Sequence, residues 1–79
     1  VTGFQTDAGF TCGIYEEAVL KQTAVRQSDQ VIALMDSSKI GVKSSFHVCR
    51  LEDIDLVVSD GQLPKEFLAE CERLHVTVL

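Results

Sequence analysis

A run of five apolar residues, Val31 to Met35, ends abruptly in the polar segment Asp36-Ser37-Ser38-Lys39. This pattern is typical of a buried parallel strand that delivers polar groups to its carboxyl end. In open α/β sheets, ligands bind in the crevice outside the carboxyl ends of the strands. The segment therefore predicts both an architecture and the place of a binding site.

The composition narrows the class of protein. The chain has 79 residues, of which 46% are hydrophobic, and a formal net charge of −5. A chain of this length makes one small domain or part of a larger one, and its apolar content is that of a folded protein. No apolar run is long enough to cross a membrane, so no membrane contact is expected. The acidic balance disfavours direct nucleic-acid binding, which needs a basic stripe. The start of the chain, which has no Met and no signal-peptide pattern, suggests a fragment.

Helix and strand patterns alternate along the chain. We predict helices over residues 15–27 and 65–74, because the first has acidic residues in its first turn and Arg26 near its end, and the second follows Pro64. The remaining predictions are strands over residues 31–35, 56–58 and 76–78, a short strand over 46–48, a single helical turn over 51–54, and loops over 5–13 and 37–45. Such alternation implies a parallel sheet. We therefore predict a three-layer α/β arrangement in which helices cover the faces of a parallel sheet.

The cysteines and histidines do not point to a metal or to catalysis. Cys12, Cys49 and Cys71 are odd in number and lack metal-ligand spacing, which predicts free thiols in a cytoplasmic protein. His47 and His75 have no partner at metal or triad spacing. No metal and no cofactor are expected.

Two clusters carry chemistry. Lys39 can meet a phosphate or a sugar oxygen, while Ser37, Ser38 and Asp36 can bond to sugar hydroxyls. The same residues also fit an Asx-type turn with a solvated lysine, and both interpretations stay open. Asp60 with Gly61, at the end of the strand over 56–58, is interpreted as a turn.

Glu16 and Glu17 form the second cluster, at the start of the first predicted helix. Carboxylates there stabilise the helix dipole, and one of them can also face the carboxyl edge of the sheet. Adjacent helix residues point about 100° apart, so this pair cannot act as a catalytic dyad on one substrate atom.

In their order, several segments resemble the effector-binding domain of DeoR-type bacterial transcriptional repressors. These segments are Gly9-Phe10-Thr11, Glu16-Glu17-Ala18-Val19-Leu20-Lys21, Val31 to Gly41 and Leu51 to Asp60. The resemblance covers nearly the whole chain. The stretches Asp36-Ser37-Ser38-Lys39-Ile40-Gly41 and Ile54-Asp55 through Asp60 are its most specific parts.

The resemblance implies that residues 1–79 are the C-terminal part of a sensor domain whose fold is similar to ribose-5-phosphate isomerase. It implies a phosphorylated sugar or related metabolite as effector, and operator DNA bound only through an N-terminal helix-turn-helix domain outside these residues. Lys39, Asp36 and Glu17 match family positions. The family's Gly-Ala-Asp-Gly stretch corresponds here to Gly3-Phe4-Gln5-Thr6, so its aspartate is absent or displaced to Asp7.

We therefore predict a non-catalytic sensing segment of a homo-oligomeric repressor of sugar metabolism, with an effector site of Lys39, Glu17, Asp36, Ser37, Ser38 and Asp7. The main alternative is a sugar-phosphate isomerase-like enzyme of the same fold, in which Glu17 is the one nominated general base. A third alternative is an assembly module with apolar contacts from Phe46, Val48 and Leu79.

Overall fold

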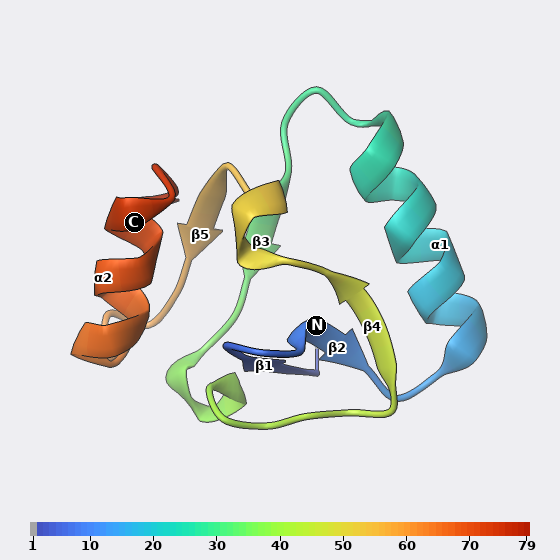
Figure 1. The fold of residues 1–79 in the computed structure, drawn as a ribbon, viewed down its shortest axis with the longest axis horizontal. Coiled ribbons are helices and arrows are strands. Elements are labelled where there is room, and N and C mark those ends of the chain that lie inside the picture. Colours follow the sequence, from blue (N-terminus) through green and yellow to red (C-terminus); the bar gives the residue numbers. More distant parts are fainter. Residues whose placement is uncertain (1) are drawn as a thin grey trace.

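The computed structural model describes residues 2–79; Val1, the first residue of the predicted 1–79 domain, lies outside the described residues. The elements in chain order, with η for a 3-10 helix, are β1 (Gly3–Gln5), β2 (Gly9–Cys12), α1 (Tyr15–Gln27), β3 (Ile32–Leu34), η1 (Ser37–Lys39), β4 (Phe46–Cys49), η2 (Leu51–Asp53), β5 (Leu56–Val58), α2 (Lys65–Arg73) and β6 (Thr77–Val78) (Figure 1). They form two three-stranded sheets, β1-β2-β4 and β3-β5-β6.

The parallel sheet confirms the three predicted strands and their direction. Strand β5 pairs in parallel with β3 on one side and with β6 on the other. Val57 at the centre of β5 is fully buried, and Ala33 and Met35 bury one side of the β3 segment. The apolar runs thus form this sheet because their buried side chains share one core.

The antiparallel sheet contradicts the prediction of a loop over residues 5–13. Strands β1 and β2 form an antiparallel hairpin, and β2 also pairs antiparallel with β4, the predicted short strand. All four residues of β2 are buried. Gly9 adopts a φ of 70°, and a Cβ atom there would clash with the carbonyl oxygen of Cys49. The glycine that suggested a loop instead lets the chain pass close to the next strand.

Both helices lie where the sequence predicts them, but they do not cover the faces of one parallel sheet as predicted. Helix α1 has the predicted bounds and packs against β2 and β4, while α2 packs beside β6. Figure 1 shows the two helices on opposite sides of the molecule. α2 ends where His75 adopts a φ of 60°.

The α/β class is confirmed, but the described strands form a parallel and an antiparallel sheet rather than one parallel sheet, because the unpredicted β2 provides the surface that α1 covers. The three-layer isomerase-like arrangement stays a prediction.

Phe4 connects the antiparallel sheet to α2 and to the segment after β3. Its ring centroid lies 4.8 Å from that of Phe10 on β2 and 5.1 Å from that of Phe67 on α2. Its backbone forms a parallel bridge with Ile40, and the Gly41 N–H donates to the Phe4 carbonyl at 2.8 Å. The segment that follows β3 is therefore attached to β1. None of the helices among residues 2–79 has the length and apolar character needed to cross a membrane.

The positive φ of Gly9 supports a stability prediction. Gly9→Ala should destabilise the fold by about 2 kcal/mol or more, because it adds left-handed strain to a clash with backbone. Gly13→Ala is the matched control, since a Cβ at Gly13 meets nothing within 4 Å. Urea unfolding of both variants checks this, and equal midpoints for the two would contradict the close approach at Gly9.

Buried cysteines give a second prediction. The three cysteines are buried and free, as expected. Burial, and to a smaller degree the Asp53 carboxylate, raises the pKa of the Cys49 thiol to about 11. Since the thiolate is the reactive form, alkylation of Cys49 at pH 8 should be about 100-fold slower in the folded chain than in guanidinium. Mass spectrometry of the labelled peptides measures both rates, and similar rates would show that Cys49 is open to solvent.

Candidate functional site

The predicted polar segment lies at the carboxyl end of β3, as the sequence indicated, and forms the short helix η1. Asp36 caps this helix: its Oδ1 accepts hydrogen bonds from the Ser38 N–H at 3.1 Å and from the Ser38 hydroxyl. This is the arrangement expected of an Asx-type turn. The Asp36 carboxylate and the Ser38 hydroxyl are therefore hydrogen-bonded to each other within the segment.

Asp60 anchors the start of this segment from the neighbouring strand. It follows β5, and its Oδ2 accepts from the Ser37 N–H at 3.2 Å and from the Ser37 hydroxyl at 3.1 Å, while Oδ1 accepts from the Gln62 N–H at 3.0 Å. Hydrogen bonds from the Gln62 and Ser37 backbone lower the pKa of the Asp60 carboxyl. The interpretation of Asp60 as a turn residue was thus incomplete. The repeated pattern of an apolar run followed by a carboxylate, on two adjacent parallel strands, is the signal from which this contact could have been inferred.

Lys39 ends η1 and is half-buried. Among the described residues it takes part in none of the ion pairs, which instead join Lys21 to Glu17, Arg50 to Glu52 and Arg73 to Glu70. The end of the segment is also attached, because the Gln5 side chain donates to the Gly41 carbonyl at 3.0 Å. The ammonium therefore sits on a short segment that both sheets hold.

Asp7 lies in the turn between β1 and β2, on the rim of an open hollow of about 800 Å³. The end of β1, the segment Ile40–Gly41 and the start of α2 line this hollow together. Its size falls within the range of small-molecule sites. Asp7 and the two residues that directly follow Lys39 therefore line the same hollow.

Glu17 lies apart from this cluster in its contacts. It sits in the first turn of α1, its carboxylate is 3.7 Å from the Lys21 ammonium, and no described hydrogen bond or ion pair joins it to η1. In Figure 1, the first turn of α1 and η1 lie on either side of β1 and β2. The proximity of Glu17 to Lys39 stays a prediction.

No group of three or more His, Cys, Asp or Glu side chains within residues 2–79 is arranged to hold a metal ion. The local charges come from Asp36, Lys39 and Asp60, and hydroxyls from Ser37 and Ser38. The two carboxylates and the two hydroxyls hydrogen-bond with one another, so the Lys39 ammonium is the group of this cluster that can bind an anion by a charged hydrogen bond.

Comparison with known proteins shows the family. The sequence profile of the DeoR C-terminal sensor domain matches residues 1–61, and this chain belongs to that family. The HTH-type transcriptional regulator GlpR of Haloferax volcanii is 34% identical over 73 residues, which are 92% of this chain and 29% of GlpR. The HTH-type transcriptional repressor GlcR of Bacillus subtilis is 36% identical over 69 residues, 87% of this chain and 26% of GlcR. GolR of Listeria innocua, also an HTH-type transcriptional regulator, is 32% identical over 63 residues, 80% of this chain and 25% of GolR.

The chain thus spans between a quarter and three tenths of the length of these relatives. The family resemblance inferred from the motifs is confirmed, and the relatives are transcriptional regulators.

The anchoring of Ser37 by Asp60 gives a pH prediction. Because the folded-state pKa of Asp60 is lowered, its hydrogen bonds hold η1 at neutral pH and are lost as the pH falls through that lowered pKa. In an NMR titration, the Ser37 amide shift should follow the Asp60 carboxyl carbon, with a common midpoint below that of an ordinary aspartate. Asp60→Asn should abolish the Ser37 titration, and a Ser37 amide that still titrates in this variant would disprove the link.

Proposed function

We propose that residues 1–79 are the effector-sensing segment of a DNA-binding transcriptional repressor of sugar metabolism. The effector is a phosphorylated sugar or a related metabolite, and the longer protein works in the cytoplasm as a homo-oligomer. Operator DNA is bound by a helix-turn-helix domain elsewhere in that protein, and the sensing segment does not carry out catalysis.

The relatives support the regulatory part of this proposal. Those named above are HTH-type transcriptional regulators, and one is named a repressor. The acidic net charge of −5 is consistent with DNA being read by another part of the protein, since DNA-binding surfaces are basic.

One observation carries the effector site: Lys39 stands at the carboxyl end of a parallel strand with no carboxylate partner among residues 2–79. Ligands of open α/β sheets bind at that edge, and an ammonium there can meet a phosphate as a point charge. Asp7 lines the neighbouring hollow, and in this proposal its carboxylate accepts hydrogen bonds from the sugar end of the same ligand.

An isomerase-like enzyme is the second candidate, with Glu17 as its general base. The Glu17 carboxylate lies beside Lys21 on an exposed helix surface, and both side chains are well exposed, at 52% and 39%. A general base must lie within hydrogen-bond reach of the proton that it abstracts from a bound substrate, and none of the hollows described here is lined by Glu17. The exposed pair and the regulatory relatives therefore favour sensing over catalysis.

Lys39→Met in the full-length protein tests the proposal. The substitution keeps much of the apolar stem and removes the charge, so effector binding should weaken by about 1.5–3 kcal/mol, the range for a hydrogen bond to a charged group. This is about tenfold to a hundredfold or slightly more in affinity. Folding and operator binding without effector should change little, because surface substitutions stay within about 0.5 kcal/mol.

Lys43→Met is the matched control, since Lys43 is an exposed lysine of the same loop. Titration of each variant with candidate sugar phosphates, read by release from operator DNA, gives the midpoints. A midpoint shift for Lys39→Met alone supports the site. Equal midpoints for wild type and Lys39→Met would remove Lys39 from it.

A further inference from the structure

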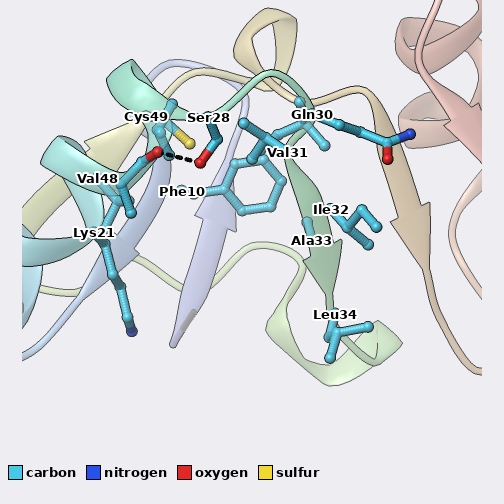
Figure 2. A pocket seen from close by; sticks show the side chains of 13 residues that line it. Phe10, Lys21, Ser28, Gln30, Val31, Ile32, Ala33, Leu34, Val48 and Cys49 are labelled. Carbon is cyan, nitrogen blue, oxygen red and sulfur yellow. Dashed lines mark hydrogen bonds between the residues drawn. The ribbon is translucent and has the colours of Figure 1, made fainter.

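Strand β3 leads from an apolar region of the molecule into the polar segment that carries Lys39. Figure 2 shows Ile32 and Leu34 of this strand beside a hollow of about 400 Å³, whose lining is mostly apolar and comes mainly from α1, β2, β3 and β4. No residue of the segment 36–41 lines this hollow. The polar contacts of the segment are therefore made after the strand ends, and two of them reach Asp60 at the end of β5.

The Asp60 carboxylate joins two loops of the chain. Its Oδ2 accepts both hydrogen bonds from Ser37, and its Oδ1 accepts from the Gln62 N–H. The lowered pKa of Asp60 keeps the carboxyl ionised at neutral pH, so these hydrogen bonds are charge-assisted. Because the two oxygens belong to one planar group, a displacement of Ser37 changes the hydrogen-bond geometry at Gln62.

The two loops lead to two walls of the hollow beside Asp7. Beyond Ser37 the chain reaches the segment Ile40–Gly41, which lines this hollow of about 800 Å³. Beyond Gln62 it reaches Pro64 and the first turns of α2, which line the same hollow. The Asp60 carboxylate therefore links these two walls through the loops that precede them.

We propose that Asp60 couples the effector site to α2. An anion bound at Lys39 displaces η1, and the carboxylate transmits this displacement to the turn at Gln62 and so to the start of α2. Coupling between two sites requires an element that both of them bias, and Asp60 is bonded to both loops. This inference rests on the proposed sensing function and deepens it, because it names the element that responds to the effector.

Hydrogen exchange in the full-length protein without ligand tests the coupling of the two loops. Gly61→Ala strains the turn beside Asp60 without a clash, because Gly61 has a φ of 80° and a Cβ there meets nothing within 4 Å. The Ile40 amide, which donates to the Ser37 carbonyl, should then exchange about tenfold faster. Gly13→Ala is the matched control, since Gly13 is equally open but is not among the glycines with positive φ.

The same substitution in an Asp60→Asn background shows whether the carboxylate is the link. There, Gly61→Ala should not change the Ile40 exchange rate further. An Ile40 rate that ignores Gly61→Ala, or that responds equally in both backgrounds, would overturn the proposal.

The response to ligand gives a second test. The Kd values of inorganic phosphate and of a panel of pentose and hexose phosphates are measured for the full-length protein, free and bound to operator DNA. The ratio of the two Kd values measures the coupling. In Asp60→Asn this ratio should fall toward one, by about fivefold or more. A purely structural role of Asp60 would raise both Kd values by the same factor, and the resulting unchanged ratio would overturn the proposal.

Asp55→Asn is the matched control for the ligand test. Asp55 also joins β3 to β5, because its Oδ2 accepts from the Val31 N–H at 2.7 Å, but it does so at the amino ends of these strands. This variant should keep the wild-type ratio. If no sugar phosphate binds the wild type, or if Lys39→Met leaves the Kd unchanged, the sensing proposal fails, and the exchange rates alone then decide whether Asp60 couples the loops. If ligand binds through Lys39 and the ratio of Asp60→Asn is that of wild type, sensing stands and the coupling is wrong.

Discussion

The packing of Phe4 between Phe10 and Phe67 is the interaction on which the rest of the structure depends. A 79-residue chain can bury only a small hydrophobic core, and here the parallel and the antiparallel sheet share that core. Phe4 is 5% exposed and contacts one aromatic ring from the antiparallel sheet and one from α2. Because aromatic side chains bury a large area with defined geometry, this one residue fixes how β1 and α2 face each other.

The backbone of Phe4 extends this connection to the candidate site. The bridge to Ile40 and the hydrogen bond from Gly41 attach the polar segment to β1, while Asp60 attaches its other end to β5. The residues that carry Lys39 are therefore placed by both sheets together. The polar segment is therefore more than a loop that follows a strand, because it is attached at both of its ends.

The sequence predicted the parts of the fold whose signals are local. The apolar runs of β3 and β5 and the helix α1 were placed correctly, because burial periodicity and helix-end charges act over a few residues. The hairpin of β1 and β2 was missed. A glycine in the sequence is compatible both with a loop and with a strand that approaches another backbone closely, as Gly9 approaches Cys49. Of the site, the position of Asp36 through Lys39 was predictable. The contact of Asp60 with Ser37 was not predicted. It joins residues 23 positions apart, and its one sequence signal is the pattern of an apolar run followed by a carboxylate, which occurs twice.

The double attachment of the polar segment has an entropic consequence. An untethered loop loses conformational freedom when it closes on a ligand, and this ordering opposes binding. Between Ser37 and Gly41 that freedom is already restricted by the capping bonds of Asp36, the carboxylate of Asp60 and the carbonyl of Phe4. A ligand that contacts Lys39 therefore meets a backbone that is preorganised by folding, and only the lysine side chain remains to be ordered. Affinity for a small, highly hydrated molecule depends strongly on such preorganisation, because few apolar contacts are available to compensate for the ordering.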